Sequence, residues 1–150
     1  KKMADLVTTL SESVTLNGSL RGSTNSVTTT GIVDVFERIV TCTQAVVTTI
    51  GVFAALPSTS PGAIDVDRTR YVRVTNLDTN NIELAIVTTA SNYQVTLTAG
   101  NSHILCLGSS VARGEEDTTP GFLTLQDITS LQVKPVTAND AQVELFVGLV

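Results

Sequence analysis

The residues best suited to catalysis are few in this 150-residue chain. His103 is its one histidine, and Cys42 and Cys106 are its only thiols. A metal site needs several such ligands, and a general base needs a second group that orients it. No serine or cysteine stands in the spacing of a nucleophile elbow, and no glycine-rich phosphate motif occurs. We therefore expect a structural role for His103, no catalytic residue, no cofactor and no enzymatic activity.

Both cysteines lie in apolar runs of the kind that form strands. A free cysteine in such a run behaves as a small buried hydrophobic residue, and cytoplasmic proteins seldom depend on a disulfide. The pattern favours two buried thiols. A Cys42–Cys106 disulfide that joins two sheets is the alternative, and it requires the two Cα atoms to lie within bonding reach.

Carboxylates gather at two places, Asp65 with Asp67 and the acidic run 115–117. Calcium takes six to eight oxygen ligands, and no calcium-loop pattern with a central glycine follows the first pair. Arg68 and Arg70 are simpler partners for that pair. The acidic run is typical of a solvated patch. The sequence therefore predicts no metal site.

The charge balance disfavours nucleic-acid binding. The net charge is −5, and the chain has only three lysines. Its one basic cluster, Arg68, Arg70 and Arg73, adjoins Asp65 and Asp67. With aromatic residues at 4% and no tryptophan, rings that could stack on bases or sugars are scarce.

The surface is expected to be poor in charge, because charged residues make up only 15% of the chain, against ~25% in an average domain. A sparsely charged surface suggests that part of the exterior is covered by partners. No signal peptide is visible, and the longest apolar run, residues 50–56, is far shorter than a membrane span of about 20 residues. We expect synthesis in the cytoplasm and no membrane contact.

Short alternating apolar segments separated by turn residues predict an all-β protein. The expected strands are 6–16, 26–30, 33–41, 46–53, 71–75, 82–87, 93–98, 103–107, 122–125, 131–136 and 142–147. No segment of helical length repeats with a period of 3.6 residues. We expect one domain, residues 1–150, folded as an antiparallel, jelly-roll-like β-sandwich, with an extended N-terminal segment over about residues 1–30.

Two finer expectations concern pairing and the core. Residues 71–87 read as a β-hairpin whose turn is 76–81, so Arg73 and Glu83 are expected to pair across the two strands. The four phenylalanines lie in strand-like runs and are expected in the core. They are Phe36, Phe53, Phe122 and Phe146.

Two stretches break the strand pattern and are candidate contact surfaces. Residues 18–25 and 108–121 are polar and contain glycine, and the second is long enough that such a loop is often functional. Solvated connections are the alternative for both. The candidate assembly contacts are Arg21, Ser23, Asn25, Arg113, Glu115, Glu116 and Asp117.

Several stretches together resemble small β-sandwich virion proteins of tailed phages, notably those of marine bacteria and cyanobacteria. They are RYVRVTNLD, YQVTLTAGNSHIL, FLTLQDITSLQVKP and QVELFVG. The resemblance covers about residue 35 to the C-terminus, and the opening LSESVTLNGSL is also similar. The resemblance implies a non-enzymatic capsid decoration (cement) protein.

The same resemblance implies partners and a location. The partners would be the major capsid protein and further copies of this chain, as a dimer or trimer, on the outer capsid surface. The polar loops and the N-terminal segment would touch the shell. A tail or tail-fibre subunit, structural or receptor-binding, is the alternative from the same family, and an enzyme that lacks a recognisable motif is the alternative from another class.

Overall fold

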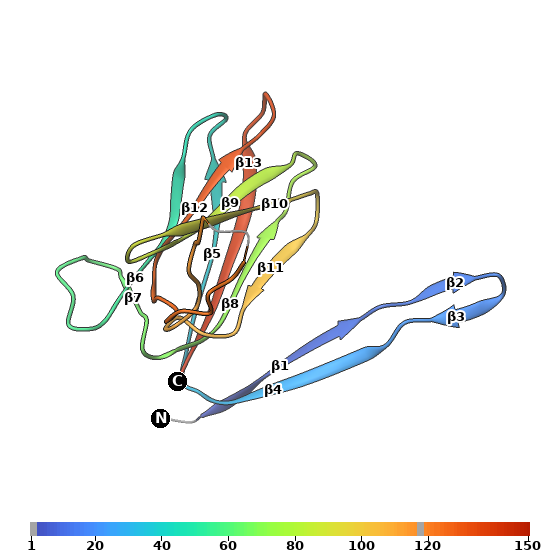
Figure 1. Ribbon diagram of the computed structural model, residues 1–150, viewed down its shortest axis with the longest axis horizontal. Helices are drawn as coiled ribbons and strands as arrows, with labels where there is room; N and C mark the ends of the chain where they lie inside the picture. Colours follow the sequence, from blue (N-terminus) through green and yellow to red (C-terminus); the bar gives the residue numbers. More distant parts are fainter. Residues whose placement is uncertain (1–2, 117–118) are drawn as a thin grey trace.

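The structure is a computed structural model that describes residues 3–116 and 119–150. Figure 1 shows a body of two packed β-sheets and a long β-hairpin that leaves the body near both termini. We call this hairpin the arm. It is formed by β1 (Ala4–Ser11) and β4 (Thr24–Ile32), and its tip by β2 (Val14–Leu16) and β3 (Ser19–Arg21).

The body has two sheets, and in each the spatial order of the strands differs from their order in the sequence. The first sheet runs β11 (Ser102–Leu105), β8 (Thr69–Asn76), β13 (Ala141–Leu149), β5 (Asp34–Cys42). The second runs β10 (Asn92–Leu97), β9 (Ile82–Thr88), β12 (Ile128–Pro135), β6 (Thr48–Ala54), and the short β7 (Ile64–Asp65) lies parallel to β6 at its edge.

This strand order is that of a jelly roll. Apart from β7, every pair of neighbouring strands in the body is antiparallel. The late strands β12 and β13 lie between earlier ones, β12 between β9 and β6, and β13 between β8 and β5. The chain therefore passes repeatedly from one sheet to the other, as in double-sheet jelly rolls. The predicted all-β, antiparallel sandwich is confirmed.

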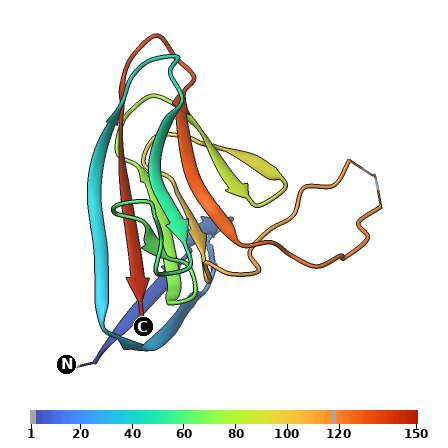
Figure 2. The ribbon, with the colours of Figure 1, turned by 90° about the vertical axis from the view of Figure 1, so that its left-hand side faces the viewer.

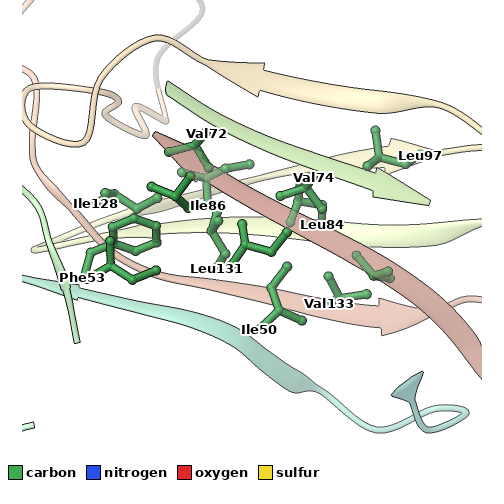
Figure 3. Close-up of a cluster of buried hydrophobic side chains, with 14 of the residues drawn as sticks. Ile50, Phe53, Val72, Val74, Leu84, Ile86, Leu97, Ile128, Leu131 and Val133 are labelled. Carbon is green, nitrogen blue, oxygen red and sulfur yellow. The ribbon is translucent and has the colours of Figure 1, made fainter. Parts of the chain in front are cut away.

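The core lies between the two sheets and is almost entirely aliphatic. Successive residues of a strand point to opposite faces, so every second side chain of each strand enters the core. Figure 3 shows side chains from both sheets in one cluster. Fully buried members include Ile50, Val72, Val74, Ile82, Leu84, Ile86, Ile128, Leu131, Val133, Val143, Leu145 and Val147.

Polar contacts close the two open sides of the sandwich. On one side, the guanidinium of Arg38 on β5 donates to the carbonyl of Ile50 on β6. On the other side, the Tyr93 hydroxyl on β10 lies 3.2 Å from Nε2 of His103 on β11. His103 therefore ties the edge strands of the two sheets together.

The expected hairpin over residues 71–87 is wrong. Its two strands, β8 and β9, belong to different sheets, and the connection between them crosses the sandwich. The buried amide of Asn76 donates to the carbonyls of Asn80 and Leu97 and so supports this crossing. Arg73 consequently pairs with Glu144 on β13, at 3.0 Å, and not with Glu83.

Some expected core positions also lie elsewhere. Both cysteines are free, but only Cys42 is buried, because Cys106 lies at the exposed end of β11. Of the phenylalanines, Phe53 is in the core and Phe36 packs at its margin. Phe146 lies on the outer face of the first sheet against Tyr71. Phe122 is exposed and belongs to no strand.

We predict that Leu131→Ala lowers the free energy of unfolding by about 2–5 kcal/mol, because Leu131 is fully buried between the sheets and its truncation leaves a cavity. Urea unfolding followed by circular dichroism measures the loss. The exposed Val136 is the matched control, and Val136→Ala is expected to change the unfolding free energy by less than about 0.5 kcal/mol. Equal losses for the two variants would contradict the described core.

Candidate assembly sites

The root of the arm packs against the body. Its first strand passes the outer face of the first sheet, where Leu6 and Ile32 lie over Gly148. A Cβ atom at Gly148 would meet a methyl group of each at 3.4 Å, so glycine allows the arm to approach the sheet closely. The amide of Val33 donates to the carbonyl of Leu149 at 2.9 Å and fixes the direction in which the arm leaves.

The two faces of the arm differ in character. One face carries a hydroxyl ladder, in which Thr9 bonds to Ser26 and Ser11 to Thr24, each at 2.9 Å. The opposite face carries three apolar residues that we call the arm stripe, Leu6, Leu10 and Val27, whose cross-strand partners are Thr29, Asn25 and Thr8. Such alternation is typical of a strand pair that buries one face.

Only the root of the arm stripe is covered. Leu6 is half-buried against the body, whereas Leu10 is 61% exposed and Val27 58% exposed. An isolated two-stranded hairpin is marginally stable in water at best. The distal arm therefore presents apolar surface that the body does not cover.

Local sequence explains how the chain reverses at the tip. Asn17 and Gly18 both have positive φ angles, 50° and 76°, as a two-residue type I′ hairpin turn requires. At Gly22 a Cβ atom would lie 2.0 Å from the carbonyl oxygen of Glu12, so only glycine fits where the two strands kink. The tip exposes three further apolar side chains: Val14, Leu16 and Leu20.

Three of the predicted contact residues lie on this distal arm. Arg21 ends β3, Ser23 lies in the kink, and Asn25 is on β4 opposite Leu10. The expectation that residues 18–25 form a polar loop is wrong, because they contain β3 and the start of β4. The segment is exposed nonetheless, on a strand pair and not on an irregular loop.

A second projection is the long connection between β11 and β12, which extends away from the body in Figure 2. Its base is held firmly. Ala112 and Gln126 form an isolated antiparallel bridge, and the Gln126 side-chain oxygen accepts hydrogen bonds from Thr88 at 2.6 Å and Ser91 at 2.9 Å. The Gly114 amide also donates to the Ser91 hydroxyl. These contacts root the connection on the second sheet.

The predicted charged contacts of this connection lie just beyond its base. Arg113 and Glu115 form an ion pair at 3.9 Å, and Glu115 also accepts a hydrogen bond of 2.8 Å from the Gly121 amide. Glu116 is exposed. Asp117 lies outside the described residues.

The outermost feature of the connection is apolar. Phe122 is 92% exposed, and its φ angle of 49° is uncommon for a bulky residue. The neighbouring Leu123 and Leu125 are exposed as well, and together with Arg113 and Pro120 they line a shallow hollow. An exposed aromatic ring beside a hollow is typical of the anchor residues of protein interfaces.

The predicted contact residues thus form two separate groups. The arm and the connection project from the body in different directions, as the two views in Figures 1 and 2 show. Sequence reasoning selected the polar residues of both and missed the apolar Leu10, Val27 and Phe122. For the arm, the sequence contained a signal. An alternating segment with an Asn-Gly turn forms a hairpin with two different faces, and in the structure no third strand lies beside this one.

The outer face of the first sheet is a third candidate surface. Tyr71 and Phe146 meet edge to face, with ring centres 6.0 Å apart, and Arg73 lies over the Phe146 ring. Arg73 also makes two hydrogen bonds to Glu144, and these lower the pKa of that carboxyl group. The arm root covers only the Tyr71 end of this face.

The β5 end of the same face is uncovered. Phe36 and Val40 pack against the core, so the alternation along β5 turns Val35 and Ile39 outward. Val35 is 47% exposed and Ile39 61% exposed, and we call this pair the β5 patch. By contrast, the outer face of the second sheet has a polar hollow lined largely by Glu83, Gln94, Gln132 and Lys134.

The residues whose types could support catalysis or metal binding are engaged in structural interactions. Asp65 accepts the Asp67 amide at 3.1 Å, while Arg68 and Arg70 donate to main-chain carbonyls instead of to either carboxylate. Burial raises the pKa of the Cys42 thiol. Among residues 3–116 and 119–150, no three His, Cys, Asp or Glu side chains gather closely enough to hold a metal ion. None of the described segments is an apolar helix of the length needed to cross a bilayer.

The chain matches no protein-family model, no curated protein and no solved structure. We therefore base its function on the three surfaces described above.

We predict that the stability of the protein falls as the pH is lowered from the neutral range through about 6.5, the ordinary pKa of histidine, because of His103. Burial lowers the pKa of His103 below its usual value of about 6.5, so the unfolded chain takes up the proton first as the pH falls. Above that range both states are neutral and the effect vanishes. Urea midpoints at pH 7.5 and 5.5 measure the difference, and most carboxylates stay ionised throughout.

His103→Gln is the control for this titration, since glutamine can still bond to the Tyr93 hydroxyl but does not titrate. Its urea midpoint is expected to change less between the two pH values. An identical change in both proteins would assign the pH dependence to other groups.

Proposed function

We propose that the protein is a non-enzymatic structural component of a virion, a decoration (cement) protein that binds the outer capsid surface and strengthens contacts between capsomers. The observation that carries the proposal is the pair of projections, the arm and the β11–β12 connection, which hold apolar side chains out from a well-packed body. Exposed apolar surfaces of this kind are characteristic of subunits that bury them against partners in an assembly.

Phe122 is the anchor residue in this proposal. Burial of an aromatic ring in a partner's pocket is among the largest single contributions to binding. The base of the connection is already fixed by Gln126 and Ser91, so little further ordering is required there when the ring is buried. Many copies of such a modest contact raise the stability of a shell, since each capsid subunit must break several contacts before it leaves.

The charge of the chain agrees with an exterior position. A protein with a net charge of −5 and only three lysines is repelled by packaged DNA. Among the described residues, the few cations do not form a broad basic face. The resemblance of the sequence to small phage virion proteins supports the same reading. Jelly rolls also occur in viral capsid domains, although the fold by itself carries many functions.

The first experiment is to count copies of the chain per particle, by quantitative mass spectrometry of virions purified from the phage that encodes it, with the major capsid protein as reference. We expect a copy number that matches the symmetry of the shell lattice. A few copies, matching the lower symmetry of a tail, would replace the proposal with a tail or tail-fibre subunit. Absence from the particle would refute a virion role.

We further predict that Phe122→Ser weakens attachment to the capsid at least tenfold without unfolding the protein, because the exposed ring contributes to binding and not to the core. Co-sedimentation of purified protein with undecorated capsids measures the affinity, and circular dichroism checks the fold.

Val136→Ser is the matched control, since Val136 is also exposed but lies on the β12–β13 connection. It is expected to bind like the wild type. Deletion of residues 115–123 should reproduce the loss, whereas a longer deletion from residue 108 would also remove the Ala112–Gln126 bridge. Unchanged binding of Phe122→Ser and of the short deletion would exclude this connection from the interface.

A further inference from the structure

We propose that the distal half of the arm, from Thr9 to the tip, lies on the outer face of the first sheet of a second copy of this chain, over the β5 patch. The inference deepens the proposed assembly function by naming one partner and its surface, and it rests on an assembly role but not on the kind of particle.

The arm stripe already uses this kind of surface within its own chain. Its root residue Leu6 lies over Gly148 and beside Tyr71, on the outer face of the first sheet. The row then continues without change of face to Leu10 and Val27, which are exposed. A surface that accepts the first third of the stripe is therefore chemically suited to accept the rest.

The same sheet leaves an uncovered place for that remainder. Its outer face is covered near Tyr71 by the arm root, while the β5 patch, Val35 and Ile39, stays exposed. In the described structure β5 pairs with β13 alone, so the alternate amide and carbonyl groups that point to its other edge have no neighbouring strand to pair with. Long, regular and free strand edges readily pair with other chains, and proteins usually cover them.

The direction of the arm prevents it from covering its own β5 patch. In Figure 1 the arm runs out past β8 and β11, and in Figure 2 it lies behind the body while β5 is in front. The distal arm thus leads away from the body and from the middle of β5, whereas the arm root lies close to the start of β5, where Val35 is the register partner of Gly148. A neighbour placed beside β11 would present its β5 side to the arm, and repetition of this contact gives a ring of copies where the rotation between neighbours closes and an open row where it does not.

The length of the arm suits such a contact. At about 3.3 Å per residue, the strand from Thr9 to Leu16 reaches roughly 25 Å beyond the root. Four strands about 4.8 Å apart make a sheet roughly 15–20 Å wide. The arm can therefore cross one neighbouring sheet.

The test is a disulfide between two differently tagged chains that are expressed together, both in a Cys106→Ser background that removes the exposed native thiol. One chain carries Leu10→Cys and the other Ile39→Cys. We expect mild oxidation to link unlike chains into a dimer that carries both tags. The control pair, Val136→Cys with Ile39→Cys, is expected to stay unlinked.

Each other outcome overturns the inference. Links only between two Leu10→Cys chains would show that arms pair with each other, and the absence of any link would show that the β5 patch receives no arm.

A second measurement uses the natural surfaces. By light scattering, the wild-type chain is expected to have at least twice the mass of one 15.8 kDa copy. Leu10→Ser and Ile39→Ser are expected to reduce that mass toward one copy, and the exposed Val46→Ser to leave it unchanged.

A wild-type chain that is monomeric at high concentration would refute the arm contact. The virion copy number would still decide the proposed function separately, because a protein that attaches to the shell as single copies keeps its lattice stoichiometry.

Discussion

Both projections depend on the burial of aliphatic side chains between the two sheets. The central strands β12 and β13 each lie between two other strands and send Leu131, Val133, Leu145 and Val147 into one continuous core. Burial of each such side chain contributes roughly 1.5–3 kcal/mol. Because the buried core comes from the body, with Val111 at the base of the β11–β12 connection packed against it, the distal arm and the outer part of the connection keep their own apolar residues outside.

The apolar residues left outside are not spread evenly. The outer face of the second sheet is polar around Glu83 and Lys134, as expected of a solvated sheet face. The first sheet, by contrast, exposes Ile39 and packs Tyr71 edge to face against Phe146. The outer face of the second sheet thus resembles a solvent-exposed exterior, and the outer face of the first sheet resembles a surface between subunits. The low proportion of charged residues in the chain is consistent with the apolar residues exposed on the outer face of the first sheet.

The sequence predicted the fold class but not the pairing of strands, for a physical reason. Strict alternation over residues 82–87 and 142–147 reveals β9 and β13, because each has one face in the core. Turn residues, however, are the same in a hairpin and in a connection between sheets, so residues 76–81 predicted the wrong partner for β8. Phe122 to Leu125 also alternates, yet no neighbouring strand is present to pair with it, and alternation alone does not reveal this. Of the candidate contacts chosen from the sequence, Arg21 and Arg113 lie on the two projections and stay predictions, whereas the exposed apolar side chains there, Leu10, Val27 and Phe122, were not among them.

The two projections are rooted on different sheets, and this separates two tasks. The arm is held by Leu6 and Val33 against the first sheet, and the connection by Gln126 against Ser91 of the second. A rigid sandwich between them keeps the two at a fixed separation and orientation, since its interior is close-packed and deforms little. A contact made by the arm therefore does not have to disturb one made by Phe122. If copies join through their arms, every connection in the ring is held in a repeated arrangement, and the ring binds a regular surface with the combined strength of several weak contacts.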